Sequence, residues 1–150
     1  NCPMIVKVLL VATPLLLGLQ SAHALSPPRE QCLTLEQGWV RAPVAGRDMT
    51  AAYGQLHNRC SRSASVSSME SPQAAAVELH RSEVVDGVSR MRPAPDVVIE
   101  PGTHVVLEPG GLHLMLHGLV PGVQAGSELE LRLGDSRGGK DYQFLPVRAR

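Results

Sequence analysis

Residues 111–118 read GLHLMLHG, and this stretch decides the fold class because leucine alternates with other residues at the two-residue period of a β-strand. Its three leucines lie on one face of such a strand, and its two histidines and its methionine lie on the other. The leucine face predicts a packed core, so the imidazoles and the thioether are expected to project away from it. Residues 128–133, ELELRL, repeat the alternation with charges on the outer face.

Short strands with turn signals between them follow along the rest of the chain. Asp86-Gly87 and Pro101-Gly102 are typical turns. The 14 glycines and 12 prolines among 150 residues argue against a helical bundle. The spacing predicts one all-β domain, a sandwich or a barrel, with candidate strands at Leu33 to Arg41, Ala51 to Asn58, Ala64 to Met69, Ala75 to Arg81, Val84 to Met91, Val97 to Ile99, His104 to Leu107, Leu112 to Leu119, Glu128 to Leu133 and Tyr142 to Val147.

The charge balance of the sequence argues against two classes of binding partner. Fourteen basic and fourteen acidic side chains give a formal net charge of zero, which argues against nucleic acid or an anionic membrane surface as a partner. Nucleophile elbows, zinc-protease motifs and phosphate loops are missing from the sequence. We therefore do not expect an enzyme.

The N-terminus resembles an export signal. Lys7 precedes an apolar stretch from Val8 to Leu19, and Ala22-His23-Ala24 fits the A-x-A pattern of signal peptidase. We expect residues 1–24 to be a signal peptide, with 1–3 as an upstream extension before Met4. Residues 25–150 would then form the mature domain, exported to the periplasm as a soluble protein without stable membrane insertion.

Two cysteines remain in that mature domain. No lipobox-like apolar triplet precedes Cys32, so lipid attachment there is not expected. The strands at Leu33 to Arg41 and Ala51 to Asn58 predict a hairpin centred on Gly46, which would place Cys32 opposite Cys60. In an oxidising compartment this predicts a disulfide.

A second hairpin brings another histidine close to a methionine. Asp86-Gly87 between valines predicts a type I′ turn, and the resulting register places Met91 opposite Ser82. His80 lies two residues from Ser82 and therefore shares its face, diagonal to Met91.

The four positions His80, Met91, His113 and Met115 form the pattern H-x10-M-x21-H-x-M, whose chance expectation is roughly 2 in 10,000. With its flanking motifs the sequence resembles the periplasmic copper chaperone family written PCu(A)C over about residues 38–147. The matching motifs are GWVR (38–41), VELH (77–80), DGV (86–88), MRP (91–93) and PGGLHLML (109–116). The resemblance implies a cupredoxin-like Greek-key β-barrel that carries Cu(I) and delivers it to cytochrome oxidase assembly, towards the CuA centre.

The donor types agree with this resemblance. Thioethers favour Cu(I), and imidazole accepts either copper state. Zinc would more often recruit cysteine, histidine or carboxylate ligands than two methionines, and blue copper needs a thiolate. We expect one Cu(I) per monomeric chain, bound by His80, Met91, His113 and Met115, and handed to an oxidase subunit or another copper chaperone. A secreted non-metal scaffold or adhesion module is the alternative, and a copper-dependent redox enzyme is a third hypothesis.

The other histidines of the mature domain lie outside this four-residue set. His117 shares the face of His113, where PCu(A)C relatives commonly show methionine or an apolar residue, and we expect it to be auxiliary to the metal site. His57 and His104 lie in separate strands without a methionine or cysteine at ligand spacing, so a structural or solvent-exposed role is expected.

The remaining methionines and aromatic residues are expected to pack. Met49 is placed in a loop and Met69 at a strand end. Trp39 and Tyr53 are expected to anchor a small core on neighbouring strands.

Overall fold

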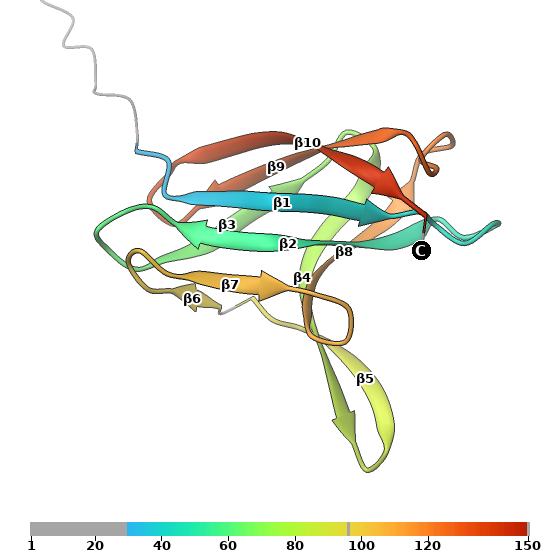
Figure 1. The fold of residues 1–150 in the computed structure, drawn as a ribbon, viewed down its shortest axis with the longest axis horizontal. Helices are drawn as coiled ribbons and strands as arrows, with labels where there is room; N and C mark the ends of the chain where they lie inside the picture. The colour runs from blue at the N-terminus through green and yellow to red at the C-terminus, as the bar shows by residue number, and fades with distance from the viewer. Residues whose placement is uncertain (1–29, 96, 150) are drawn as a thin grey trace, which may run out of the picture.

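The computed structural model describes residues 30–95 and 97–149, and every regular element within these ranges is a β-strand (Figure 1). The predicted signal peptide, 1–24, lies outside the described residues. The all-β prediction is confirmed. The strands are β1 (Leu33–Arg41), β2 (Met49–Asn58), β3 (Ala64–Glu70), β4 (Ala74–Val85), β5 (Val88–Pro93), β6 (Val98–Ile99), β7 (His104–Leu107), β8 (Leu112–Leu119), β9 (Glu128–Asp135) and β10 (Lys140–Arg148).

The described strands join in one sheet, in the order β5-β4-β8-β2-β1-β10-β9-β3-β6, and β7 pairs with β2 off this path. β1 and β10 run parallel, whereas the other pairs are antiparallel. β2 pairs with β8 near its start and with β7 near its end. Among the described residues, no helix has the length and apolar character to cross a membrane.

The core lies between the inward faces of these strands. The predicted leucine face of β8 is confirmed, because Leu112, Leu114 and Leu116 are all buried. The leucines of β9 are buried as well, with charged residues between them on the outer face. Burying a leucine contributes about 1.5–3 kcal/mol, so these alternating strands fix which face of the sheet is internal.

A β-bulge interrupts the β1–β2 hairpin. Near the turn, Trp39 pairs with Tyr53 as the predicted register requires, but the register shifts by one residue between Glu36 and Trp39. Gly54 opposes the bulge with a φ of 150°, and a Cβ there would lie 2.8 Å from the Glu36 carbonyl oxygen. Only glycine permits this close approach of the two backbones.

The β4–β5 hairpin has the predicted turn and register. Asp86 and Gly87 have φ angles of 53° and 76°, as a type I′ turn requires, and Ser82 pairs with Met91. Figure 1 shows the hairpin extending beyond the rest of the sheet, and all of β5 is exposed. One end of the candidate site therefore lies on a projecting element.

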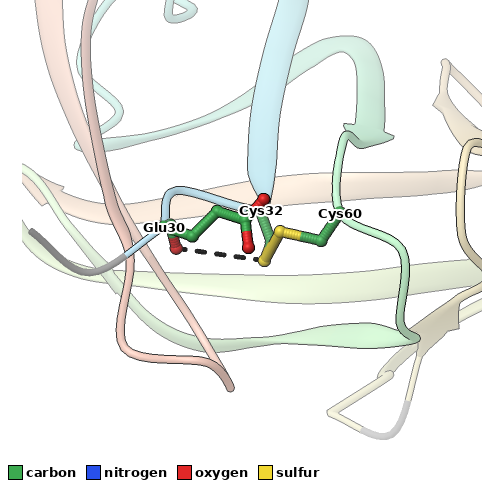
Figure 2. A group of neighbouring side chains, drawn as sticks. All are labelled: Glu30, Cys32 and Cys60. Atoms are coloured by element: carbon green, nitrogen blue, oxygen red, sulfur yellow. Dashed lines mark hydrogen bonds between the residues drawn. A yellow bond between two sulfur atoms is a disulfide. The ribbon is translucent and has the colours of Figure 1, made fainter. Parts of the chain in front are cut away.

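The predicted disulfide between Cys32 and Cys60 is present, with 5.0 Å between the two α-carbons (Figure 2). The buried carboxylate of Asp135 accepts hydrogen bonds from the backbone N–H groups of Cys32 and Leu33, at 2.8 and 3.3 Å. It also accepts one from the backbone N–H of Gly139, at 3.0 Å. The disulfide thus holds the start of β1 to the segment after β2, and Asp135 holds it against the end of β9.

Removing the disulfide should destabilise the fold without changing its topology. The bond joins residues 28 positions apart, so its loss in a Cys32→Ala/Cys60→Ala variant should lower the free energy of unfolding by about 3–4 kcal/mol. Urea unfolding of the two proteins would measure this difference. Two free thiols in the unreduced, unfolded wild-type protein would contradict the assignment.

Candidate metal centre

Three of the four predicted ligands, His80, His113 and Met115, lie on the β4–β8 pair, and Met91 lies on β5. His80 pairs directly with His113, and Glu78 pairs with Met115. Directly opposed residues of antiparallel strands project to the same face, so these four side chains are neighbours on the side opposite the leucines. The tertiary pairing thus joins the two histidine–methionine pairs that were predicted separately.

His113 lies on the predicted face, but it does not project into solvent. It is 3% exposed, and its Nδ1–H donates a hydrogen bond of 2.9 Å to the Gly111 carbonyl oxygen. A carbonyl can only accept, so Nδ1 carries the proton. The Nε2 atom is buried and has no hydrogen-bond partner among the described residues, which leaves its lone pair free for a ligand.

His80 has the opposite arrangement of its ring nitrogens. Its side chain is 13% exposed, and its Nε2–H donates a hydrogen bond of 2.8 Å to Glu78 Oε2. The Nδ1 atom is buried without a partner. A carboxylate that holds one imidazole nitrogen while the other is free is the usual environment of a metal-binding histidine. Glu78 was missed in the sequence, although its spacing of two residues from His80 on one strand indicated a shared face.

Both predicted methionines line a surface pocket of about 210 Å³ together with His113. Met115 comes from β8, and Met91 from the projecting hairpin, where it is 58% exposed. Met49 also lines this pocket, and its expected loop position is wrong: it is the first residue of β2 and pairs with His117. The pocket therefore collects three thioethers.

Two arginines and an aromatic residue form other parts of the same pocket. Arg41 and Arg47 line it, and no carboxylate from the described part of the chain does. The Arg41 guanidinium lies over the Tyr53 ring, 5.1 Å from its centroid, and the Tyr53 and Trp39 rings are 4.8 Å apart. Tyr53 is buried as expected for a core anchor, but it also contributes to the pocket wall.

His117 lies on the same face, one step further along β8. Its Nε2 is 3.8 Å from Glu78 Oε2, and its ring centroid is 6.2 Å from that of His80. The ring centroids of His80 and His113 are 6.1 Å apart. His117 does not line the pocket that holds the methionines.

His57 and His104 lie away from this centre. They pair directly across β2 and β7, and their rings stack with centroids 4.7 Å apart, a contact that the sequence did not reveal. Burial, and the proximity of the His104 imidazole, lower the pKa of His57. Cys32 and Cys60 lie near Glu30 (Figure 2), but the disulfide leaves neither sulfur able to act as a thiolate ligand.

Comparison with known proteins gives a family match and several structural matches. Residues 33–144 match the family described as "Putative lipoprotein LpqE-like". "Putative lipoprotein Lxx21020" of Leifsonia xyli subsp. xyli is 34% identical over 115 residues, which cover 76% of this chain and 68% of that protein.

Among solved structures, the copper-bound PCuAC domain from PmoF2 superposes with a TM-score of 0.65 at 21% identity, covering 79% of this chain and 93% of that domain. The solution structure of Cu(I)-DR1885 from Deinococcus radiodurans gives a TM-score of 0.60 at 25% identity, covering 79% of this chain and 80% of that protein. The fold is therefore that of PCuAC domains.

The hydrogen bonds predict opposite tautomers for the two paired histidines. In the metal-free protein at mildly alkaline pH, His113 should carry its proton on Nδ1 and His80 on Nε2. Long-range ¹H–¹⁵N correlation spectra distinguish the two forms. A Glu78→Ala variant should lose the preference at His80 and keep it at His113. The same tautomer at both residues in the wild-type protein would contradict the arrangement.

Proposed function

The chain belongs to the LpqE-like family and has the PCuAC fold, as the sequence resemblance predicted, and on this premise we propose that it is an exported chaperone for one Cu(I) ion. One observation carries the proposal. His80 Nδ1 and His113 Nε2 lie on directly paired residues and are buried acceptors without hydrogen-bond partners among the described residues. His113 also lines the pocket of Met91 and Met115, which His80 does not line.

Buried polar atoms without partners are rare because each costs about 1–3 kcal/mol of desolvation. The cost of these two imidazole nitrogens would be offset when a metal ion accepts both lone pairs. Their neighbours already fix both tautomers in the form that such an ion needs. The apo protein would thus be organised for its cargo in advance.

The other donors and the local charge favour Cu(I). Met91 and Met115 supply neutral, soft thioethers, which prefer Cu(I) to harder cations. Arg41 and Arg47 line the pocket without a carboxylate, so a monovalent ion meets less repulsion there than a divalent one. Both cysteines among the described residues are bonded to each other, so no thiolate from this part of the chain can build a blue-copper site.

Exposure of Met91 suits the transfer of cargo to another protein. Met91 lies on the projecting β5, whereas His113 is buried beneath the pocket. An acceptor would reach the Met91 side of the ion first and replace that thioether before the imidazoles. Stepwise exchange of ligands moves the ion without releasing it into solvent.

The family resemblance extends the proposal to the acceptor, a CuA-type oxidase subunit or another copper chaperone. To test this step, the copper-loaded protein is mixed with an isolated CuA domain. The absorbance of the CuA centre then measures how much copper has been transferred.

For localisation we propose export to the periplasm with cleavage after Ala24, so N-terminal sequencing of the exported protein should begin at Leu25. The disulfide agrees with an oxidising compartment, and it occupies the sulfur of Cys32, which therefore cannot carry a lipid.

Removing one thioether should weaken Cu(I) binding with little effect on folding. Met91→Leu keeps the side-chain volume at an exposed position, so we expect at least about a tenfold loss of Cu(I) affinity and a near-wild-type melting temperature. Competition with a chromophoric Cu(I) chelator measures the affinity. X-ray absorption should show one sulfur fewer in the copper shell.

Met69→Leu is the matched control, because Met69 lies on β3 and does not line the methionine pocket. It should bind one equivalent of Cu(I) with unchanged affinity. An unchanged sulfur shell in both Met91→Leu and Met115→Leu would overturn the ligand set. Absence of stoichiometric Cu(I) binding by the wild-type protein would instead favour a scaffold that binds no metal.

A further inference from the structure

A second group of donor atoms lies beside the copper pocket, on the same face of β4 and β8. Glu78, His80 and His117 each offer one ligand atom, and these atoms all lie within 4.8 Å of one another. Glu78 Oε2 is 2.8 Å from His80 Nε2 and 3.8 Å from His117 Nε2. Neither Glu78 nor His117 belongs to the ligand set proposed for Cu(I).

The chemistry of this group differs from that of the pocket. It offers two imidazoles and a carboxylate, a donor set typical of borderline divalent cations such as Cu²⁺ and Zn²⁺. The carboxylate supplies the negative charge that a divalent ion needs, whereas the pocket is lined by Arg41 and Arg47. The two groups therefore present opposite charges on one sheet face.

The geometry allows the three donors to close around an ion. Ligand atoms bound at about 2.0–2.2 Å in a tetrahedral site lie roughly 3.3 Å apart. His117 would therefore move inward, and the 2.8 Å contact between His80 Nε2 and Glu78 Oε2 would widen slightly. The side chains of His117 and Glu78 are 37% and 53% exposed, and the small Ala76 is the residue paired with His117 on β4. Both side chains therefore border solvent, and a small residue lies opposite His117.

We propose that Glu78 Oε2, His80 Nε2 and His117 Nε2 form a site for one divalent cation, with Cu²⁺ bound more tightly than Zn²⁺. The inference deepens the proposed function, because His80 is shared with the Cu(I) site. A neutral imidazole has one lone pair. His80 can bind Cu(I) through Nδ1 with the proton on Nε2, or a divalent ion through Nε2 with the proton on Nδ1.

The two sites therefore exclude each other. When Cu(I) binds His80 Nδ1, the proton stays on Nε2, which is the nitrogen that the divalent site requires. That N–H then donates its hydrogen bond to the Glu78 carboxylate. One chain would hold either a monovalent ion in the pocket or a divalent ion beside it. The oxidation state of copper would decide which donors hold it.

Zinc is the probe, because Zn²⁺ cannot change oxidation state during the measurement. Titration of the disulfide-bonded mature chain against a chromophoric zinc indicator should show one Zn²⁺ per chain. Glu78→Gln and His117→Ala should each weaken Zn²⁺ binding at least about tenfold, and His117→Ala should change Cu(I) affinity less than tenfold. Both changed side chains are exposed, and circular dichroism would confirm that the variants fold.

Two control variants distinguish this site from the methionine pocket and from the second histidine pair. Met91→Leu should retain wild-type Zn²⁺ affinity. His104→Ala removes an exposed imidazole from the other histidine pair and should also leave Zn²⁺ affinity unchanged. Zn²⁺ binding lost in His104→Ala but kept in His117→Ala would overturn the assignment.

Competition tests the mutual exclusion directly. Protein loaded with one equivalent of Cu(I) should take up no Zn²⁺ at the affinity of the metal-free chain, and equal Zn²⁺ affinity in both forms would overturn shared use of His80. If the proposed Cu(I) function is wrong, the result differs from both of these outcomes: the wild-type chain would bind Zn²⁺ as described but would not bind Cu(I).

Discussion

The pairing of β4 with β8 is the constraint on which the rest of the structure depends. It places His80 directly opposite His113 and Val77 opposite Leu116, so one register aligns the metal face and the core face together. A slip of one residue would turn the imidazoles into the core and the leucines into solvent. Because that exchange would expose several buried leucines, hydrophobic packing also fixes the position of the donors.

The hydrogen bonds around the paired histidines determine which ring nitrogen of each is available to a ligand. The Gly111 carbonyl oxygen and the Glu78 carboxylate each hold one ring nitrogen, and in both rings the other nitrogen is buried without a partner. Glu78 also lies near His117, so the same carboxylate contacts a histidine of the proposed Cu(I) site and a histidine of the inferred divalent site. A single carboxylate thus links the proposed Cu(I) site to the inferred divalent site.

Rigidity and exposure are distributed unevenly over the molecule. The disulfide and the buried Asp135 carboxylate hold the end of the sheet where β1 begins, whereas the β4–β5 hairpin projects from it with β5 exposed (Figure 1). This hairpin carries Met91. An anchored sheet with one proposed ligand on an exposed element agrees with the proposed role of binding an ion and passing it on.

Local sequence patterns determined most of the fold. Alternation defined the leucine faces of β8 and β9, and Asp86-Gly87 fixed both turn and register of the β4–β5 hairpin, because these features depend only on neighbouring residues. The pairing of Cys32 with Cys60 also followed from one hairpin, although the bulge opposite Gly54 shifted its register. The ligand set of His80, Met91, His113 and Met115 remains a prediction from spacing.

Other features depended on contacts between strands distant in the sequence. The burial of His113, the position of Met49 beside the pocket and the stacking of His57 on His104 required strand neighbours that no local pattern specifies. Alternation indicated that Glu78 shares a face with His80, but only the pairing of β4 with β8 brought it near His117. Side-chain period sets the face on which a residue lies, whereas the tertiary structure decides which residues meet on that face.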